Sequence, residues 1–393
     1  MENGEVILKV ENLVKLYGLN KQSARELLKK GADKKEVLRQ TGVTVAVNNV
    51  SFDVKKGEIF VLIGLSGSGK STVIRCVNML QQPTSGKITF ENQNIGSLSK
   101  SELIDFRRTK ASMVFQNFGL MSHRNVLSNV AYGLEVRGVK KEEREKKAME
   151  IIAMVGLDGW ENKSILSLSG GMRQRVGIAR ALTNDPGMLL MDEPFSALDP
   201  LVRRDMQFEL LSIQRKMNKT ILFITHDIDE AFKLGDRIAI MRDGMIIQNG
   251  TAEEMASNPA DDYVRDFIDS ADKSHVLCAK NIMITPTSLI HTRDGAGNAL
   301  NAMKKTGFSS TYVIDEKMRF VGVLTLEDAM KARAENLPID SFIIKDADRV
   351  APDAVVADIM PLAAHTRFPI AVVDEEGRLK GIVSKAAVLS SLS

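Results

Sequence analysis

One stretch, residues 59–78, constrains the fold of this chain more than any other. It reads IFVLIGLSGSGKSTVIRCVN, which is a run of five apolar residues, a turn of glycine and serine, and a helix-forming segment. The apolar run predicts a buried parallel strand, and the glycines let backbone N–H groups point toward one place. The turn matches G-x-x-x-x-G-K-[ST], a pattern that cradles nucleotide phosphates. A plain glycine-serine turn explains the stretch less well, so we predict a nucleotide site on an α/β fold.

The residue types in this turn fit phosphate chemistry. A helix that begins near Lys70 aims its positive N-terminal end at the turn. In the pattern the lysine reaches the β- and γ-phosphate oxygens, and the hydroxyl that follows binds Mg²⁺. The candidate nucleotide-binding residues of the turn are Gly64, Ser66, Gly67, Ser68, Gly69, Lys70, Ser71 and Thr72, with Ser71 also a candidate metal ligand.

Composition narrows the class of protein. At 393 residues the chain is long enough for two or three domains, and its net charge of +3 gives no reason to expect nucleic-acid binding. No apolar run approaches the roughly 18 residues needed to span a bilayer, and the acidic N-terminus does not resemble a signal peptide. The two cysteines, Cys76 and Cys278, offer neither a disulfide framework nor a zinc spacing. We expect a cytosolic chain that reaches a membrane only through a partner.

Two strands are predicted before the phosphate turn, over residues 6–16 and 44–54. Between them, residues 20–42 read as two short helices, each closed by a glycine. This insert carries more lysine and arginine than acid. It is either a solvated helical hairpin or a docking element for a partner or for acidic lipid head groups.

The next part of the chain alternates between helical and strand-like text. Residues 100–157 are helical and charged, apart from a strand-like segment at 112–116. Short apolar strands follow at 187–194 and 221–227, and residues 237–250 read as a hairpin turning at Asp243-Gly244. This alternation predicts a mostly parallel sheet with antiparallel additions.

An internal repeat begins after residue 268. Residues 310–330 align without gaps on residues 369–389, and each unit reads as strand, acidic turn, strand and helix. Two such units are too small to be stable alone, so we expect a pseudo-symmetric pair. The domain boundary is predicted in the polar stretch between residues 269 and 277.

Two further motifs carry chemistry. Asp192 and Glu193 end an apolar strand, where open α/β sheets bind ligands, and such carboxylates can hold Mg²⁺ and polarise an attacking water. Ser169, Gly170 and Gly171 open a helix and form a second anion site, although Ser169 also fits an ordinary N-cap. One nucleotide site with a spare anion site suggests that two copies face each other and complete each other's sites.

These motifs together resemble the nucleotide-binding domain of ABC transporters. The segments GLSGSGKST, LSGGM, LLMDEP, SALDP and ITHD occur in the order of that family over about residues 6–265. The resemblance implies an ATP-hydrolysing P-loop domain with a helical subdomain, in which Asp192 helps to bind Mg²⁺ and Glu193 is the general base.

Other roles are carried over from the same resemblance. Ser169 and Gly171, with Gly170 between them, would contact the γ-phosphate of ATP held by the opposing copy. Gln116 resembles the residue that approaches Mg²⁺ and faces the membrane subunits, and His226 resembles the switch histidine near the γ-phosphate. Asp199 resembles the residue of the loop that follows the catalytic strand, and Tyr17 the aromatic that stacks on adenine.

The whole chain resembles the ATPase subunit of bacterial glycine betaine/proline-betaine importers. Met172 in the signature, the insert at 20–42 and the phrase GEIFVLIGLSGSGKSTVIR carry this likeness, and the C-terminal repeats resemble tandem CBS domains. The implied organisation is an ABC ATPase domain at 1–268, a linker at 269–276, and α+β CBS repeats at 277–333 and 338–393. It also implies a cytoplasmic, peripheral position beside integral membrane permease subunits. A substrate-binding protein or domain would deliver the substrate to these subunits.

The sequence leaves three roles open for the CBS pair. The first repeat has Gly322, Thr325 and Asp328, which resemble a stretch that holds the ribose of an adenine nucleotide, while the second has Ala387 where the acid would stand. We therefore expect at most one ribose site of this type in the pair. A purely structural pair is the alternative, and a sensor of ionic strength would need a basic patch that the sequence does not show densely.

Alternatives to betaine import also follow from these motifs. An importer of another small osmolyte, such as carnitine or choline, is the nearest. A soluble ABC ATPase acting on nucleic acid fits poorly with the weak net charge. A nucleotide sensor without hydrolysis fits poorly with the presence of both Glu193 and His226.

Overall fold

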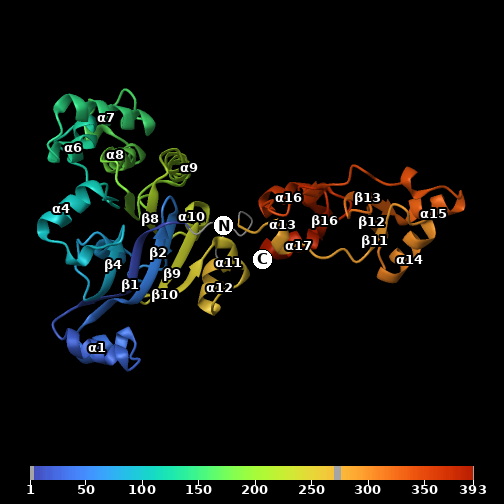
Figure 1. The fold of residues 1–393 in the computed structure, drawn as a ribbon, viewed down its shortest axis with the longest axis horizontal. Helices are drawn as coiled ribbons and strands as arrows, with labels where there is room; N and C mark the ends of the chain where they lie inside the picture. Colours follow the sequence, from blue (N-terminus) through green and yellow to red (C-terminus); the bar gives the residue numbers. More distant parts are fainter. Residues whose placement is uncertain (1–3, 270–275, 393) are drawn as a thin grey trace. The chain divides into compact units, whose positions relative to one another are not determined.

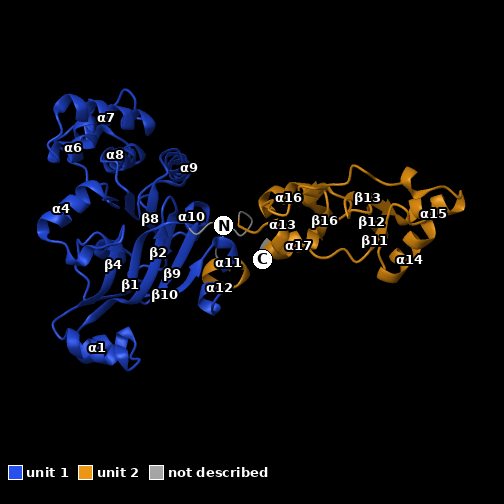
Figure 2. Ribbon diagram, viewed as in Figure 1, with its two compact units in different colours: residues 1–255, 259–264 blue, residues 256–258, 265–393 orange. Residues whose placement is uncertain are grey.

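The computed structural model describes residues 4–269 and 276–392 (Figure 1). Contacts within the chain divide it into two compact units (Figure 2). The first unit consists of residues 1–255 and 259–264, and the second of residues 256–258 and 265–393. The predicted linker at 269–276 lies mostly outside the described residues.

Two sheets form the first unit within the described part of the chain. The larger has the order β10-β9-β3-β8-β7-β6 and is parallel except for β10. The smaller is antiparallel, with the order β2-β1-β4-β5. The strands are β1 (Val6–Tyr17), β2 (Thr44–Lys55), β3 (Ile59–Ile63), β4 (Ser85–Phe90), β5 (Gln93–Asn94), β6 (Ala111–Val114), β7 (Met188–Asp192), β8 (Thr220–Thr225), β9 (Arg237–Arg242) and β10 (Met245–Gly250). The prediction of an α/β fold with a mostly parallel sheet is confirmed. Strand β10 is the antiparallel addition to that sheet, and the other antiparallel strands form a sheet of their own.

Helix α3 (Lys70–Val77) packs into the core between the two sheets. Strands β3, β7 and β8 are buried along their whole length, which explains why their sequences are apolar without alternation. Phe52 of β2 stacks on Phe60 of β3, with ring centroids 5.1 Å apart, and so joins the two sheets. The phosphate turn between β3 and α3 is therefore built on the most buried part of the unit.

The remaining helices of this unit fall into distinct groups. Figure 1 shows α6, α7 and α8 gathered as a helical subdomain, well away from α1. The helices are α1 (Lys21–Lys29), α2 (Lys34–Thr41), α4 (Lys100–Thr109), α5 (Val126–Val130), α6 (Tyr132–Val136), α7 (Lys141–Met154), α8 (Gly170–Thr183), α9 (Pro200–Met217) and α10 (Ile228–Leu234). Two further helices, α11 (Ala252–Ser257) and α12 (Asp262–Asp269), have residues in both units. None of the helices in the described ranges has the length and apolar character that crossing a bilayer requires.

The second unit contains the repeat. Its two sheets have the orders β11-β12-β13 and β14-β15-β16, so each repeat adds a parallel strand that the sequence analysis did not anticipate. The strands are β11 (Leu289–His291), β12 (Ser310–Ile314), β13 (Phe320–Thr325), β14 (Arg349–Val350), β15 (Ile370–Val373) and β16 (Leu379–Val383). The helices are α13 (Ala279–Ile282), α14 (Ala296–Thr306), α15 (Leu326–Ala334), α16 (Val356–His365) and α17 (Lys385–Leu392).

The two repeats exchange their leading segments. Ile284, which precedes the first repeat's sheet, bridges to Ile382 of β16, and Ile344, which precedes the second repeat's sheet, bridges to Val323 of β13. This crossing explains a glycine at the same place in each repeat. A Cβ on Gly322 would lie 2.3 Å from the Ile344 carbonyl oxygen, and one on Gly381 would lie 2.8 Å from Met283 Sδ. A shared core that includes Tyr312 and Ile382 joins the repeats, and the Tyr312 hydroxyl donates to the Pro369 carbonyl at 2.7 Å. The repeats thus form one pseudo-symmetric pair in space, as expected.

Candidate functional site

The phosphate turn is held in a shape that only glycine allows at two positions. Gly64 has φ +154° and Gly69 has φ +104°, conformations that L side chains rarely adopt. A Cβ on Gly64 would lie 2.1 Å from the Met241 carbonyl oxygen, and one on Gly69 would lie 2.3 Å from the Ala46 carbonyl oxygen. Strands β9 and β2 therefore press the turn from outside, so that it keeps its curvature.

Lys70 lies inside this turn. Its side chain is only 4% exposed, and its Nζ donates to the carbonyl oxygens of Gly64 at 2.6 Å and Leu65 at 3.2 Å. Burial lowers the pKa of Lys70, while the carboxylates of Glu193 and Asp192 act in the opposite direction. The buried ammonium group is thus placed where the negative charge of a bound polyphosphate would stabilise it.

Ser71 and Asp192, two of the predicted metal ligands, are in direct contact. The Ser71 hydroxyl donates to Asp192 Oδ1 at 2.8 Å, although the two residues lie 121 positions apart. Burial raises the pKa of Asp192, and the Ser71 hydrogen bond and the Arg75 guanidinium, 3.6 Å from Asp192 Oδ2, work against that rise. One hydroxyl and one carboxylate are hard oxygen donors that suit Mg²⁺, which takes its other ligands from water and nucleotide phosphates. The donor set therefore fits Mg²⁺.

Glu193 follows β7 directly and turns its carboxylate toward β8. Its backbone has φ +48°, which is uncommon for a residue with a side chain, and its N–H donates to the Ile224 carbonyl at 3.0 Å. Glu193 Oε2 lies 3.0 Å from His226 Nδ1. On the other side, Gln116 Nε2 donates to Ser196 Oγ at 3.3 Å, and Ser196 Oγ donates to the Glu193 carbonyl at 3.0 Å. The three predicted catalytic side chains are thus connected, and Ser196 is a link that the sequence analysis missed.

A cavity of about 480 Å³ runs over the phosphate turn. This volume is in the range of small-molecule sites. Its lining includes most of the predicted phosphate residues together with Gln116 and Glu193. It also includes three residues of helix α2 that the sequence analysis left unassigned. The lining residues are Lys34, Lys35, Leu38, Thr44, Val45, Ala46, Ser66, Gly67, Gly69, Lys70, Ser71, Thr72, Gln116 and Glu193.

The second anion motif does not join this cavity. Ser169 is exposed at the start of α8, where its hydroxyl accepts the Met172 N–H at 3.3 Å as an N-cap. Asp199 caps α9 in the same way, accepting the Val202 N–H at 3.1 Å. Among the residues lining the phosphate cavity, none of Ser169, Gly170, Gly171 and Asp199 appears. Within one chain, the two predicted halves of the site are separate.

Tyr17 is directed elsewhere than predicted. Its hydroxyl bonds Gln81, and Lys15 Nζ lies 5.0 Å from the centroid of its ring. Tyr17 does not line the phosphate cavity, whereas Leu38 and Val45 do. Its role as an adenine platform remains a prediction that this side-chain position does not support.

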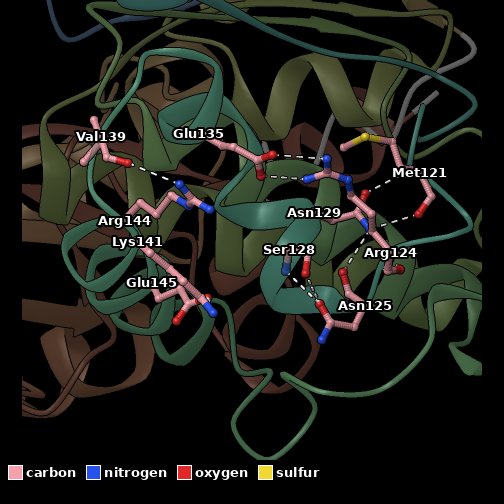
Figure 3. Close-up of polar contacts among 10 residues, drawn as sticks. All are labelled: Met121, Arg124, Asn125, Ser128, Asn129, Glu135, Val139, Lys141, Arg144 and Glu145. Atoms are coloured by element: carbon pink, nitrogen blue, oxygen red, sulfur yellow. Dashed lines mark hydrogen bonds and ion pairs between the residues drawn. The ribbon is translucent and has the colours of Figure 1, made fainter.

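The segment after Gln116 is anchored to the helical subdomain (Figure 3). The fully buried Asn129 accepts the Met121 N–H at 2.9 Å and donates to the carbonyls of Met121, Arg124 and Asn125. Arg180 of α8 bonds the same segment through the Phe118 and Gly119 carbonyls. The helix that begins with Ser169 is therefore fastened to the segment that begins at Gln116.

A second cavity, of about 430 Å³, opens on this subdomain. Arg124 forms a double ion pair with Glu135 there, at 2.7 and 3.3 Å, which lowers the pKa of Glu135 (Figure 3). Arg144, which also lines this cavity, donates from Nη1 to the Val139 carbonyl at 3.3 Å, so its side chain is held in place too. The cavity is polar and lies beside the anchored segment.

In the CBS pair, Thr325 and Asp328 satisfy each other. The Thr325 hydroxyl donates to Asp328 Oδ2 at 2.6 Å and accepts the Asp328 N–H at 3.1 Å, capping α15. In the second repeat, Ser384 accepts the Ala387 N–H at the same distance. The geometry accounts for both hydroxyls as helix caps.

The first unit thus has the site of a P-loop nucleotide hydrolase of the ABC class. A family model described as ABC transporter matches residues 47–196, and a CBS domain model matches residues 279–335 and 339–393. The confirmed fold class is therefore an ABC-type domain followed by a CBS pair.

Relatives of known name narrow the family to which the chain belongs. It is 48% identical to the glycine betaine/carnitine transport ATP-binding protein GbuA of Listeria monocytogenes, covering 98% of this chain and 97% of the relative. It is 47% identical to the glycine betaine transport ATP-binding protein OpuAA of Bacillus subtilis, covering 98% and 92%. The chain belongs to the ATP-binding subunits of ABC transporters, in the group that includes these betaine-transport proteins. As a member of that family it is an ATPase.

Solved structures agree with this placement. The dimeric structure of MJ0796, described as a bacterial ABC transporter cassette, superposes with a TM-score of 0.53 at 32% identity, covering 62% of this chain and 98% of the other. A post-hydrolysis dimer of the same cassette, bound to ADP and Pi, superposes equally well.

Proposed function

We propose that this chain hydrolyses MgATP to drive the import of glycine betaine or proline betaine. The observation that carries the proposal is the Glu193 carboxylate, which lies 3.0 Å from His226 and lines the same cavity as the phosphate turn. A carboxylate at the end of the strand next to the Ser71–Asp192 pair is suited to accept a proton from water. ATP and Mg²⁺ are the cofactors in this proposal.

Each residue has a defined task in hydrolysis. Lys70 and the N–H groups of the turn would bind the β- and γ-phosphates, and Ser71 and Asp192 would hold Mg²⁺, with Gln116 as a further candidate ligand. The metal ion supplies charge that offsets the negative phosphate oxygens. Glu193 takes a proton from water as the water oxygen bonds the γ-phosphorus and the bond to the β-phosphate oxygen breaks. His226 orients Glu193 and approaches the γ-phosphate.

A second copy completes the site. Because Ser169, Gly170 and Gly171 lie apart from the phosphate cavity of their own chain, a head-to-tail pair would bring them to the γ-phosphate held by the opposite copy. Asp199, at the start of α9, would lie at the same interface. The dimeric cassette among the similar structures supports this arrangement.

Integral membrane permease subunits are the other partners. Arg180 links the helix that starts with Ser169 to the segment after Gln116, so closure of the pair would move the surface that carries the second cavity. We assign this surface to the permease, which places the chain peripherally on the cytoplasmic face of the cell membrane. A substrate-binding protein or domain would deliver the osmolyte to the permease, and nucleic acid plays no part.

The substrate is argued from the relatives. GbuA, OpuAA and the ProV proteins of Escherichia coli and Salmonella typhimurium are all named for glycine betaine transport. The insert, the signature with Met172 and the CBS pair are the features of this chain that support the same class. Carnitine or choline import remains the second candidate, since GbuA is also named for carnitine. An adenine nucleotide held by Thr325 and Asp328 is the regulatory candidate.

Uptake measurements test this proposal. Cells that lack this chain but contain its permease partners are complemented with the parent chain or with Glu193→Gln, and labelled glycine betaine uptake is followed at low and high osmolarity. We expect uptake only with the parent chain, with unlabelled carnitine and choline competing weakly. Equal uptake in the two strains would overturn the assignment. Uptake of carnitine in preference to betaine would replace the substrate.

A further inference from the structure

Helix α2 of the insert is held rigidly beside the phosphate turn. Val37 is fully buried in a small core with Leu16, Val43 and Val45, which joins the helix to strands β1 and β2. Asp33 caps its first turn by accepting the Glu36 N–H at 2.7 Å, and Gly42 ends it in a left-handed conformation. A solvated hairpin would need no such core, so the position of α2 is specified.

One face of α2 is turned to the cavity. Lys34, Lys35 and Leu38 line it, and their spacing of three and four positions places them on one side of the helix. Arg39 and Glu36 continue around the helix from Lys35, pair with each other at 2.6 Å, and do not line the cavity. The helix therefore presents two lysines and one leucine to the nucleotide site, and the charges beside that face are paired within the helix.

The turn between β9 and β10 ties α2 to the phosphate turn. Lys34 Nζ lies 2.6 Å from Asp243 Oδ1, and the next residue, Gly244, donates its N–H to the Ser68 carbonyl at 3.0 Å. The Lys34 hydrogen bond and charge lower the pKa of Asp243. Asp243 thus pairs directly with Lys34, while Arg242 and, at longer range, Lys35 also act on its carboxylate. Among the described residues no carboxylate lies within ion-pair distance of Lys35.

Sheet order gives the direction of a bound nucleotide. The phosphate turn follows β3, while Glu193 and Gln116 follow β7 and β6 on one side of it. Strand β9 lies on the other side of β3, and its turn holds α2. Because Glu193 and Gln116 mark the γ-phosphate end, the nucleoside must extend toward α2. Leu38, which is 49% exposed, is the largest apolar side chain lining that end.

We propose that helix α2 forms the nucleoside end of the ATP site, with Leu38 covering the purine ring and Lys35 binding the ribose and α-phosphate. The inference rests on the proposed function and deepens it. It assigns to the insert a task in nucleotide binding, and it moves the purine platform from Tyr17 to Leu38. An aliphatic side chain buries purine surface as an aromatic ring does, and an unpaired ammonium suits a phosphate oxygen.

Two titrants separate the nucleoside end from the phosphate end. The full chain carrying Glu193→Gln, which prevents turnover, is titrated calorimetrically with MgATP and with magnesium tripolyphosphate, which has no nucleoside. Leu38→Asp is compared with Leu19→Asp, because Leu19 is 98% exposed and does not line the cavity. Lys35→Ala is compared with Arg39→Ala, because Arg39 lies one turn further along the helix and does not line the cavity. Leu38→Ala serves as a second variant should the charge disturb folding, with thermal melting as the check.

We expect Leu38→Asp to weaken MgATP binding about tenfold or more, the loss of one buried leucine contact, while tripolyphosphate affinity stays unchanged. Lys35→Ala should weaken MgATP binding by a smaller factor, and Leu19→Asp and Arg39→Ala should bind as the parent does. Parental MgATP affinity in both Leu38 variants, with a loss in Tyr17→Ala, would overturn the inference. If Lys70→Ala binds both titrants as the parent does, the proposed ATP site itself fails, and the two failures are thus distinguishable.

Discussion

A hydroxyl–carboxylate pair occurs in both units of this protein, and the two pairs differ in origin. Ser71 and Asp192 meet at 2.8 Å from elements 121 residues apart, whereas Thr325 and Asp328 meet at 2.6 Å within the first turn of one helix. The first pair exists because two strands of a parallel sheet end at the same edge. The second needs only a helix start. A pair assembled across the fold at the expense of burying a carboxylate points to a ligand more strongly than one that a cap explains.

The second CBS repeat sharpens this contrast. Ser384 makes the same cap as Thr325, although Ala387 stands where the first repeat has its acid. The cap therefore does not require Asp328. The carboxylate of Asp328, which accepts the Thr325 hydroxyl at 2.6 Å, has no counterpart in the second repeat, so it is the group to test for a role in binding.

The largest effect is expected at Glu193. Glu193→Gln keeps the shape of the side chain but cannot accept a proton, so the rate of ATP hydrolysis should fall by about 10² to 10⁴, the usual contribution of a general base. MgATP affinity should stay near that of the parent, which calorimetry would check beside a steady-state phosphate-release assay. Hydrolysis within a few-fold of the parent would remove Glu193 from its assigned role.

The next effect concerns the buried pair. Asp192→Asn removes the carboxylate that Ser71 and Arg75 contact, and the apparent Mg²⁺ affinity in ATP hydrolysis should fall about 10- to 100-fold. Asp185→Asn, at an exposed ion pair with Lys219, is the matched control and should leave the Mg²⁺ dependence unchanged. The same Mg²⁺ titration curve for both variants would contradict the metal assignment.

The two units should respond to acid at different pH values. Burial raises the pKa of Asp192 above its ordinary value of 3.8. As the pH falls, this carboxylate is therefore protonated early and then no longer binds Mg²⁺. In the second unit, desolvation alone would raise the pKa of Asp374, but hydrogen bonds from Arg378 and Lys380 lower it to about 2. A depressed pKa adds stability above pH 3.8 that is lost only as the pH falls toward 2.

Mg²⁺-dependent ATP binding should therefore weaken at a higher pH than the one at which the CBS pair opens. Binding titrations and hydrogen exchange of peptides from residues 310–330 and 369–389, followed over the same pH series, would measure the two events. If these peptides open at a higher pH than the one at which ATP binding weakens, the predicted order of the two events is wrong.

The smallest effect is expected at the two caps. Thr325→Ala and Ser384→Ala each remove one N-cap and should lower the local opening free energy by about 1 kcal/mol, measured by hydrogen exchange, with ATP hydrolysis unchanged. Asp328→Asn is the companion variant that leaves the hydroxyl in place. A loss of AMP binding confined to Thr325→Ala and Asp328→Asn would show a ribose site in the first repeat. Equal behaviour of the two repeats would make the pair structural.

Sequence alone predicted the residues whose positions follow from strand ends. Glu193 and His226 each follow a strand of the parallel sheet and Gln116 lies close after another, so their convergence with Lys70 is a property of that sheet. The position of α2 could not be read in the same way, because it depends on Val37 packing against β1 and β2. Amphipathic spacing showed that the helices form but not which face meets the nucleotide.

Other features depend on pairings between distant segments. The contact of Ile284 with Ile382 in the CBS pair joins residues almost a hundred positions apart, and no local pattern marks it. The direction of the Tyr17 side chain follows from its hydrogen bond to Gln81, which lies 64 positions away in the sequence. The sequence boundaries of the repeats remain predictions, since the repeats exchange segments in space.

The separation of the phosphate cavity from Ser169 within one chain is the central claim, and mixing two inactive variants tests it directly. Lys70→Ala lacks the phosphate half of the site, and Ser169→Arg lacks the other half. In a head-to-tail pair, one of each restores a single complete site, so an equimolar mixture should recover up to about a quarter of the parental ATP hydrolysis rate. A mixture that stays as inactive as its components at every ratio, with mixed pairs confirmed to form, would contradict the shared site.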